Sequence, residues 1–210
     1  NYKKYFDRET KFFRGKLSDG SWRTPFDPYS AAHRTNDYCE GNAWQYLWLT
    51  PQDPEGLIDL MGGEETFTQK LDSLFTISSE LDDNASVDIS GMIGQYAHGN
   101  EPSHHVAYMY SYAGKQYKSA PIIRTINNTL YTDKPDGLSG NEDCGQMSAW
   151  YIFSSIGFYP VNPTNGLYVF GSPLFDEVKI NLPQEKQFII KTENNSDSNI
   201  YIQSVKLNGE

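Results

Sequence analysis

Residues 140–151 read Gly140-Asn141-Glu142-Asp143-Cys144-Gly145-Gln146-Met147-Ser148-Ala149-Trp150-Tyr151. Two adjacent carboxylates, Glu142 and Asp143, stand in a frame of glycines, and apolar residues at helical spacing begin directly behind them. Adjacent acids repel one another, which is costly unless a metal ion, a proton transfer or a hydroxyl-rich substrate uses their charge. The segment therefore predicts a helix that begins at an acidic functional site.

Two other segments have a similar layout. They are Cys39-Glu40-Gly41-Asn42-Ala43-Trp44-Gln45-Tyr46 and Gly99-Asn100-Glu101-Pro102-Ser103-His104-His105. Helix capping explains part of the pattern, because Asp37 with Glu40 and Asp143 with Gln146 both fit a capping box. Capping does not explain Glu142, nor the density of polar and aromatic residues after Glu40.

The order of the predicted helices indicates the fold class. Helices that begin with an acidic motif are rich in aromatic residues, and they alternate with helices that lack such a motif. The helices are expected at 37–49, 54–61, 64–78, from 102 onward, at 121–130 and at 144–157, with the tail of another helix at 1–14. Alternation of this kind is typical of an α/α toroid, whose inner helices run the same way. We therefore expect all three acidic motifs to meet in one cavity.

The pattern changes after Pro163. Short runs rich in β-branched and aromatic residues follow, separated by Gly, Pro, Asn and Asp, and they predict antiparallel strands at 167–170, 177–180, 188–191 and 200–205. We therefore expect a mainly α chain with two parts. Residues 1–163 would form the helical part and residues 164–210 a small β subdomain.

Composition restricts the partners. The 210-residue chain has a formal net charge of −10 and a pI near 4.8, which disfavours nucleic acid and anionic membranes. No apolar run is long enough to span a bilayer. The 15 Tyr and 4 Trp suit sugar binding, because flat rings stack on pyranose faces. The chain lacks an initiator Met and a signal peptide, and we interpret it as a fragment of a longer protein.

The residue types near the acids allow a metal site. Glu101 and His104 are three residues apart and could face one point, and oxygen-rich surroundings favour Ca²⁺, whereas two histidines would favour Zn²⁺ or iron. His105 is expected to be an exposed histidine on a capped helix. Cys39 and Cys144 are expected to be partly buried thiols rather than a disulfide. The chain has no HExxH, GxSxG, GxGxxG, Walker or CxxC motif.

Taken in order along the whole chain, these three segments and Gly157-Phe158-Tyr159-Pro160 resemble glycoside hydrolase family 92. Members of this family are calcium-dependent exo-α-mannosidases that invert the anomeric configuration. The resemblance implies an N-terminal β-sandwich domain, absent from this chain, and an (α/α)6 barrel with further β structure. This chain would be the second half of the barrel and a β tail. A periplasmic, cell-surface or secreted location is also implied.

The resemblance assigns roles to particular residues. Glu40 would be the general acid and Asp143 the general base, with Glu142 a supporting acid. Asn141 takes the place of a carboxylate present in some members, which leaves Asp143 as the sole favoured base. Glu101 would bind Ca²⁺, and His104 falls on the position of a further ligand. The ion would bind O2 and O3 of mannose and favour a distorted sugar ring. Substrate binding is assigned to the polar and stacking residues near the acids, Trp44, Gln45, Asn42 and Asn141.

The implied activity is removal of terminal α-linked mannose, most readily α-1,2-linked, from mannose-rich glycans. Inversion requires two carboxyl groups about 6.5–9.5 Å apart with a water between them. Two other functions remain open: a sugar-binding module without catalysis, and an α/α-barrel polysaccharide lyase. A binding module has no need of both Glu40 and Asp143, whereas a lyase needs a Tyr or His base and releases an unsaturated product.

Overall fold

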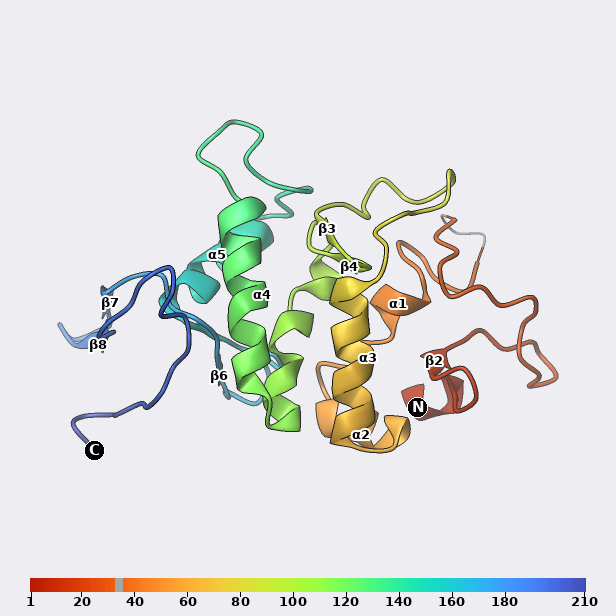
Figure 1. The fold of residues 1–210 in the computed structure, drawn as a ribbon, viewed down its shortest axis with the longest axis horizontal. Coiled ribbons are helices and arrows are strands. Elements are labelled where there is room, and N and C mark those ends of the chain that lie inside the picture. The colour runs from red at the N-terminus through yellow and green to blue at the C-terminus, as the bar shows by residue number, and fades with distance from the viewer. Residues whose placement is uncertain (33–35) are drawn as a thin grey trace.

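Helices form the body of the molecule and small antiparallel hairpins lie around it (Figure 1). The structure, a computed structural model, describes residues 1–32 and 36–210. Its helices are η1 (Tyr2–Tyr5), α1 (Ala43–Tyr46), α2 (Pro54–Met61), α3 (Glu64–Thr76), η2 (Glu101–Ser103), η3 (Val106–Ala113), α4 (Gln116–Thr129) and α5 (Gln146–Ile156), of which the η elements are 3-10 helices.

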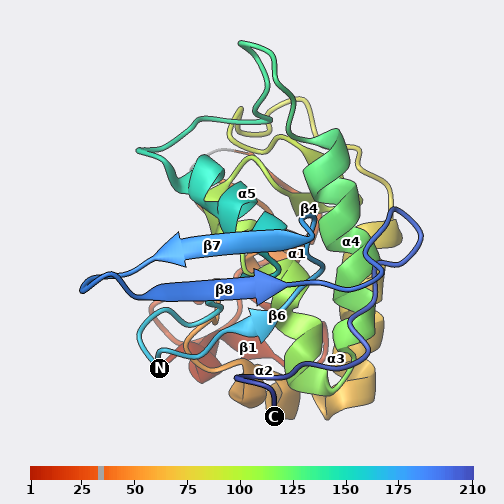
Figure 2. The same cartoon turned by 90° about the vertical axis from the view of Figure 1, so that its left-hand side faces the viewer.

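The strands pair as two-stranded antiparallel sheets. The pairs are β1 (Phe6–Asp7) with β2 (Phe12–Phe13), β3 (Met92–Ile93) with β4 (Tyr96–Ala97), β5 (Phe158–Tyr159) with β6 (Val169–Phe170), and β7 (Glu177–Asn181) with β8 (Gln187–Lys191). In β7 and β8 the register places Val178 opposite Ile190 and Ile180 opposite Phe188. Figure 2 shows these two strands side by side, and Figure 1 shows them at the left, outside the helical body.

The apolar core lies between the central helices. Six of the eight residues of η3 are buried, and this helix contacts α2, α3 and α4. One face of helix α3 packs against the core, since Phe67, Leu71 and Leu74 recur at helical spacing and are almost fully buried. The predicted helix at 54–61 is confirmed as α2. Asp53 caps it, accepting a hydrogen bond from the Gly56 N–H at 3.0 Å, and Gly62 ends it in the left-handed conformation.

Several predicted boundaries are wrong. The helix expected over 37–49 is reduced to the four residues of α1, and the helix expected from residue 102 is a pair of 3-10 helices. Helix α4 begins five residues before Pro121 and tolerates that proline at the cost of a backbone hydrogen bond. Residues 1–14 form η1 and the β1–β2 hairpin instead of a helix tail, with Phe6 and Phe13 packed edge to face.

The C-terminal region is partly as predicted. Strands β6, β7 and β8 are present, whereas residues 200–205 do not form a strand. The β5–β6 pair crosses the boundary expected near residue 164, and Arg124 of α4 donates to Ser172 Oγ at 2.9 Å and to Asn195 Oδ1 at 2.7 Å. The helical body therefore holds this region by hydrogen bonds, and the division at residue 164 stays a prediction. Within the described ranges, no helix is long and apolar enough to cross a membrane.

Candidate active site

Glu40 lies in a loop that side chains hold in place. Helix α1 begins only at Ala43, and its capping box is formed by Asn42 with Gln45. The box predicted for Asp37 and Glu40 is therefore wrong, because both residues precede the helix. Asp37 instead accepts hydrogen bonds from the Gly15 N–H at 2.8 Å and from Arg23 at 3.2 Å. The half-buried Glu40 makes no capping bond.

The side chains of Asn42 and Gln45 are used within the chain. Asn42 Oδ1 caps α1 by accepting from the N–H groups of Trp44 and Gln45, and its Nδ2 donates to Gln95 Oε1 at 2.8 Å. Gln45 Oε1 accepts from the Asn42 N–H at 2.7 Å, and its Nε2 donates to the Gln95 carbonyl at 2.9 Å. Both amides are therefore buried and paired within the chain, and their role in substrate binding stays a prediction.

Trp44 is also a packing residue. Its ring is 8% exposed and meets Phe12 edge to face, with the Lys70 ammonium 4.0 Å from the ring centroid. Phe12 and Lys70 pack against this ring, and the predicted stacking of Trp44 on a sugar stays a prediction. Trp150 is fully buried and donates to the His104 carbonyl at 2.8 Å. Asn141 is the one predicted substrate-binding residue that remains exposed.

The three acid-bearing segments contact one another, but only two of them, those of Glu101 and Gln146, line a common cavity. The Asn100 side chain donates to the Glu40 carbonyl at 3.1 Å, which joins the first segment to the second. The second and third segments are in backbone contact at Gly99 and Gly140. The approach is so close that a Cβ added to Gly140 would lie 2.3 Å from the Gly99 carbonyl oxygen. No side chain fits between these backbones.

This glycine contact leads to a stability prediction. Gly140→Ala should lower the free energy of unfolding by about 1–3 kcal/mol, because the new methyl group overlaps the Gly99 backbone. Thermal denaturation of the purified protein measures this. The control is Gly20→Asn, since a Cβ at Gly20 meets no atom and Asn tolerates its left-handed conformation. Equal melting temperatures for Gly140→Ala and wild type would show that the two segments do not pack as described.

The carboxylates of the three segments act on one another. Burial raises the pKa of Glu101, and the negative charges of Asp143 and Glu40 raise it further. Oε1 of Glu101 is buried and receives no hydrogen bond. The carboxylates of Asp143 and Glu101 lie close enough to repel one another. The molecule therefore holds a concentration of negative charge here that a cation or a proton would relieve.

Backbone strain accompanies Asp143. Asp143, Cys144 and Gly145 have φ values of 48°, 58° and 96°, so three successive residues are left-handed. Such a conformation costs about 1–3 kcal/mol for each non-glycine residue and is typical of functional sites. The capping box predicted for Asp143 and Gln146 is wrong, because Gly145 occupies the N-cap position. Asp143 is exposed instead of capping the helix.

Glu142 takes over the anchoring of α5. Its Oε1 accepts from the Ser148 N–H at 3.2 Å and its Oε2 from the Ser148 hydroxyl at 3.1 Å. Both carboxylate oxygens therefore have partners on the first turn of the helix. This explains the adjacent acids of the sequence, since Glu142 fixes the loop and Asp143 is presented to Glu101.

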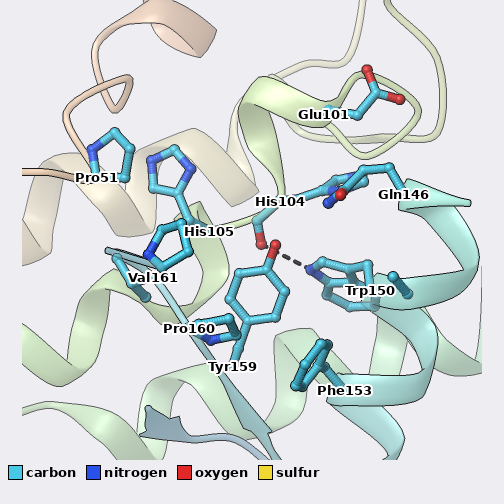
Figure 3. A pocket seen from close by; sticks show the side chains of 12 residues that line it. Pro51, Glu101, His104, His105, Gln146, Trp150, Phe153, Tyr159, Pro160 and Val161 are labelled. Carbon is cyan, nitrogen blue, oxygen red and sulfur yellow. Dashed lines mark hydrogen bonds between the residues drawn. The ribbon is translucent and has the colours of Figure 1, made fainter. Parts of the chain in front are cut away.

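A cavity of about 230 Å³ opens beside Glu101 (Figure 3). Its lining combines aromatic and imidazole side chains with prolines, and includes Glu101, His104, His105, Gln146, Trp150 and Tyr159. Glu40, Asp143 and Glu142 do not line this cavity. The acid cluster thus borders it only through Glu101.

The two neighbouring histidines are buried. His104 donates from Nε2 to the His98 carbonyl at 3.0 Å and accepts at Nδ1 from Gln146 Nε2 at 3.1 Å. His105 Nε2 donates to the Trp48 carbonyl at 2.7 Å, so the expectation of an exposed His105 is wrong. Burial lowers the pKa of each to about 4, so both imidazoles are neutral at pH 7.

Glu101 fits a hard cation and His104 does not. Ca²⁺ takes oxygen ligands, and the unpaired Oε1 of Glu101 beside Asp143 is such a donor. Both ring nitrogens of His104 already have partners in the chain, which leaves it no lone pair for a metal. No group of three or more His, Cys, Asp or Glu side chains is arranged around a metal position in the described residues. A bound Ca²⁺ would therefore need further oxygen ligands besides the Glu101 carboxylate.

Sequence reasoning missed His98 and Asn100. His98 is fully buried and its two ring nitrogens bond to the hydroxyls of Tyr96 at 2.8 Å and Tyr131 at 2.7 Å, while burial lowers its pKa to about 2. The i, i+2 spacing of Tyr96 and His98 was the available signal, because it places both side chains on one side of an extended segment.

Cys39 and Cys144 are exposed free thiols, whereas partly buried ones were expected from the sequence.

The same chain matches known proteins. The model of the glycosyl hydrolase family 92 catalytic domain matches residues 1–210. The chain belongs to glycosyl hydrolase family 92. A family 92 α-mannosidase from Bacteroides thetaiotaomicron, solved in complex with mannoimidazole, is 44% identical with a TM-score of 0.92, and the chain covers 28% of it. A family 92 inverting mannosidase from the same organism is 37% identical with a TM-score of 0.83, and 29% of it is covered. Both matches cover 100% of this chain.

A curated relative is more distant in sequence. An uncharacterized secreted glycosidase from Arthroderma benhamiae is 29% identical over 211 residues, which is 95% of this chain and 25% of that protein. The chain therefore spans about a quarter of the length of its relatives. Its helix-rich architecture with small antiparallel sheets matches that of solved family 92 enzymes.

Proposed function

We propose that the protein containing this chain is an inverting exo-α-mannosidase, assisted by Ca²⁺, that removes terminal mannose from mannose-rich glycans. One observation carries the proposal: Glu40, Glu101 and Asp143 come from three distant segments into one electrostatically coupled cluster. The two Bacteroides relatives, named as mannosidases, and the family match support the substrate class. We further propose the α-1,2 linkage as the preferred one.

In the proposed reaction the two carboxyl groups handle one proton each. The Asp143 carboxylate removes a proton from a water molecule, whose oxygen attacks the anomeric carbon. Glu40 in its acid form donates a proton to the glycosidic oxygen as that bond breaks. Water adds from the face opposite the leaving group, so the α-linked sugar leaves as β-mannose. Asn141 lies exposed beside the acids and would contact the substrate.

Ca²⁺ would be held through Glu101, and when bound it would act as a Lewis acid towards sugar hydroxyls. Its presence would also offset the repulsion between Glu101 and Asp143. We leave His104 out of the ligand set because of its two hydrogen bonds.

We expect Ca²⁺ to raise the melting temperature of the EDTA-treated full-length protein, because a ligand that binds only the folded state stabilises it by about 2.7 kcal/mol at one hundred times its Kd. Glu101→Gln should reduce this shift strongly, whereas His104→Gln should retain it. Differential scanning fluorimetry with CaCl₂, and MgCl₂ as the comparison, measures it. A Ca²⁺ shift unchanged in Glu101→Gln would remove Glu101 from the ligand set.

Membership of this family also leads to proposals for the architecture of the whole protein and for its location. We propose that residues 1–163 form part of an (α/α)6 barrel, residues 164–210 a β subdomain, and that an N-terminal domain of the same protein completes the site. The secreted relative supports a location outside the cytoplasm, periplasmic or at the cell surface.

Product analysis with a natural mannobiose tests the proposed function. Free mannose supports it. Binding of the disaccharide without turnover would indicate a binding module, and an unsaturated product absorbing in the ultraviolet would indicate a lyase.

A further inference from the structure

The loop that carries Glu40 has little regular structure to hold it. The described residues 36–42 form bends, and the four-residue helix α1 starts after them. The positions of Glu40 and its carboxyl group therefore depend on the hydrogen bonds that other parts of the chain make to this loop.

Both backbone groups of Glu40 bond to side chains. Its N–H donates to the Tyr46 hydroxyl at 3.2 Å, and its carbonyl accepts from Asn100 Nδ2 at 3.1 Å. Tyr46 belongs to the same segment, six residues later. Asn100 is sixty residues away, in the segment of Glu101, and so it fixes the loop relative to the other acids.

Asn100 is itself rigidly placed. It is 8% exposed, its N–H donates to the Ala97 carbonyl at 3.3 Å, and its carbonyl accepts from the Ser103 N–H at 3.0 Å. Residue 97 ends β4 and residue 103 ends η2, so Asn100 is held between two ordered elements. An amide N–H₂ at this point can donate to a carbonyl, which a carboxylate at the same position could not.

We infer that Asn100 is a positioning residue that sets the general acid Glu40 through its backbone carbonyl. The inference rests on the proposed function, since it assigns Asn100 to the proton donation step of that reaction. Asn100 does not have to touch the substrate, because it acts through the carbonyl of Glu40.

The leaving group separates this role from a structural one. A natural disaccharide has a poor leaving group and needs the proton from Glu40, whereas an aryl α-mannoside with a good leaving group needs it little. Misplacing an acid by about 1 Å can cost about 10²-fold. Asn100→Ala in the full-length protein should therefore lower kcat for the disaccharide about 10–100-fold more than kcat for the aryl mannoside.

The matched control is Asn127→Ala, another buried asparagine, on α4 and without a hydrogen-bond partner for its amide. It should leave the ratio of the two kcat values as in wild type. In combination with Glu40→Gln, Asn100→Ala should cause no further loss on the disaccharide, because the acid it positions is already gone.

Equal losses on both substrates, with the soluble folded state verified by circular dichroism, would overturn the inference. So would a full additional loss in the double variant. An inactive wild-type protein would instead contradict the proposed function, so the two failures are distinguishable.

Discussion

Glu40→Gln in the full-length protein should lower kcat on a natural α-mannobiose about 10²–10⁴-fold, the usual contribution of a positioned general acid. Glutamine keeps the shape of the side chain and both backbone hydrogen bonds of residue 40, but it has no acidic proton to give. Activity on an aryl α-mannoside with a good leaving group should be largely retained. Initial rates on the two substrates measure the contrast.

The control for this substitution is Glu9→Gln, at an exposed position outside the acid cluster, which should leave both rates unchanged. If Glu40→Gln slowed both substrates by the same factor, Glu40 would not be the proton donor. Full activity on the disaccharide would remove it from the reaction.

Asp143→Asn should lower kcat for both substrates about 10²–10⁴-fold. The reason is that water must be activated whatever the leaving group is. Sodium azide should restore turnover of the aryl mannoside, because this anion attacks carbon without losing a proton, and the product should be β-mannosyl azide. Chromatography and NMR of the product measure this rescue.

Glu142→Gln provides the comparison for Asp143. Glu142 bonds to Ser148 through both carboxylate oxygens, so its substitution should weaken the start of α5 and lower activity far less than Asp143→Asn does. Equal losses in the two variants, without rescue by azide in either, would contradict the assignment of the base to Asp143.

The sequence predicted the meeting of the acidic segments better than it predicted the helices around them. That prediction depended only on the order in which acid-bearing and other helices follow one another along the chain. Helix lengths depended on tertiary contacts that no local pattern contains. The helix expected at 37–49 is the clearest case, because Asp37 bonds to Gly15 and Arg23 instead of capping a helix.

Residue types near the acids did not reveal how these residues pack within the chain. Asn42, Trp44 and Gln45 have the polarity and aromaticity of a sugar site, yet their partners Gln95, Phe12 and Lys70 lie far away in sequence. His104 likewise carries the chemistry of a metal ligand, and only the structure shows that His98 and Gln146 occupy both its nitrogens. Burial of a polar group with its partner is a tertiary property, and single-residue reasoning cannot anticipate it.

Proton NMR of the first product tests the central claim most directly. The full-length protein is mixed with an α-mannoside, and the anomeric proton of released mannose is recorded before mutarotation. Glu40 as acid and Asp143 as base on either side of one water predict that β-mannose forms first and α-mannose appears later. α-Mannose as the first product would contradict the two-carboxyl, single-displacement mechanism.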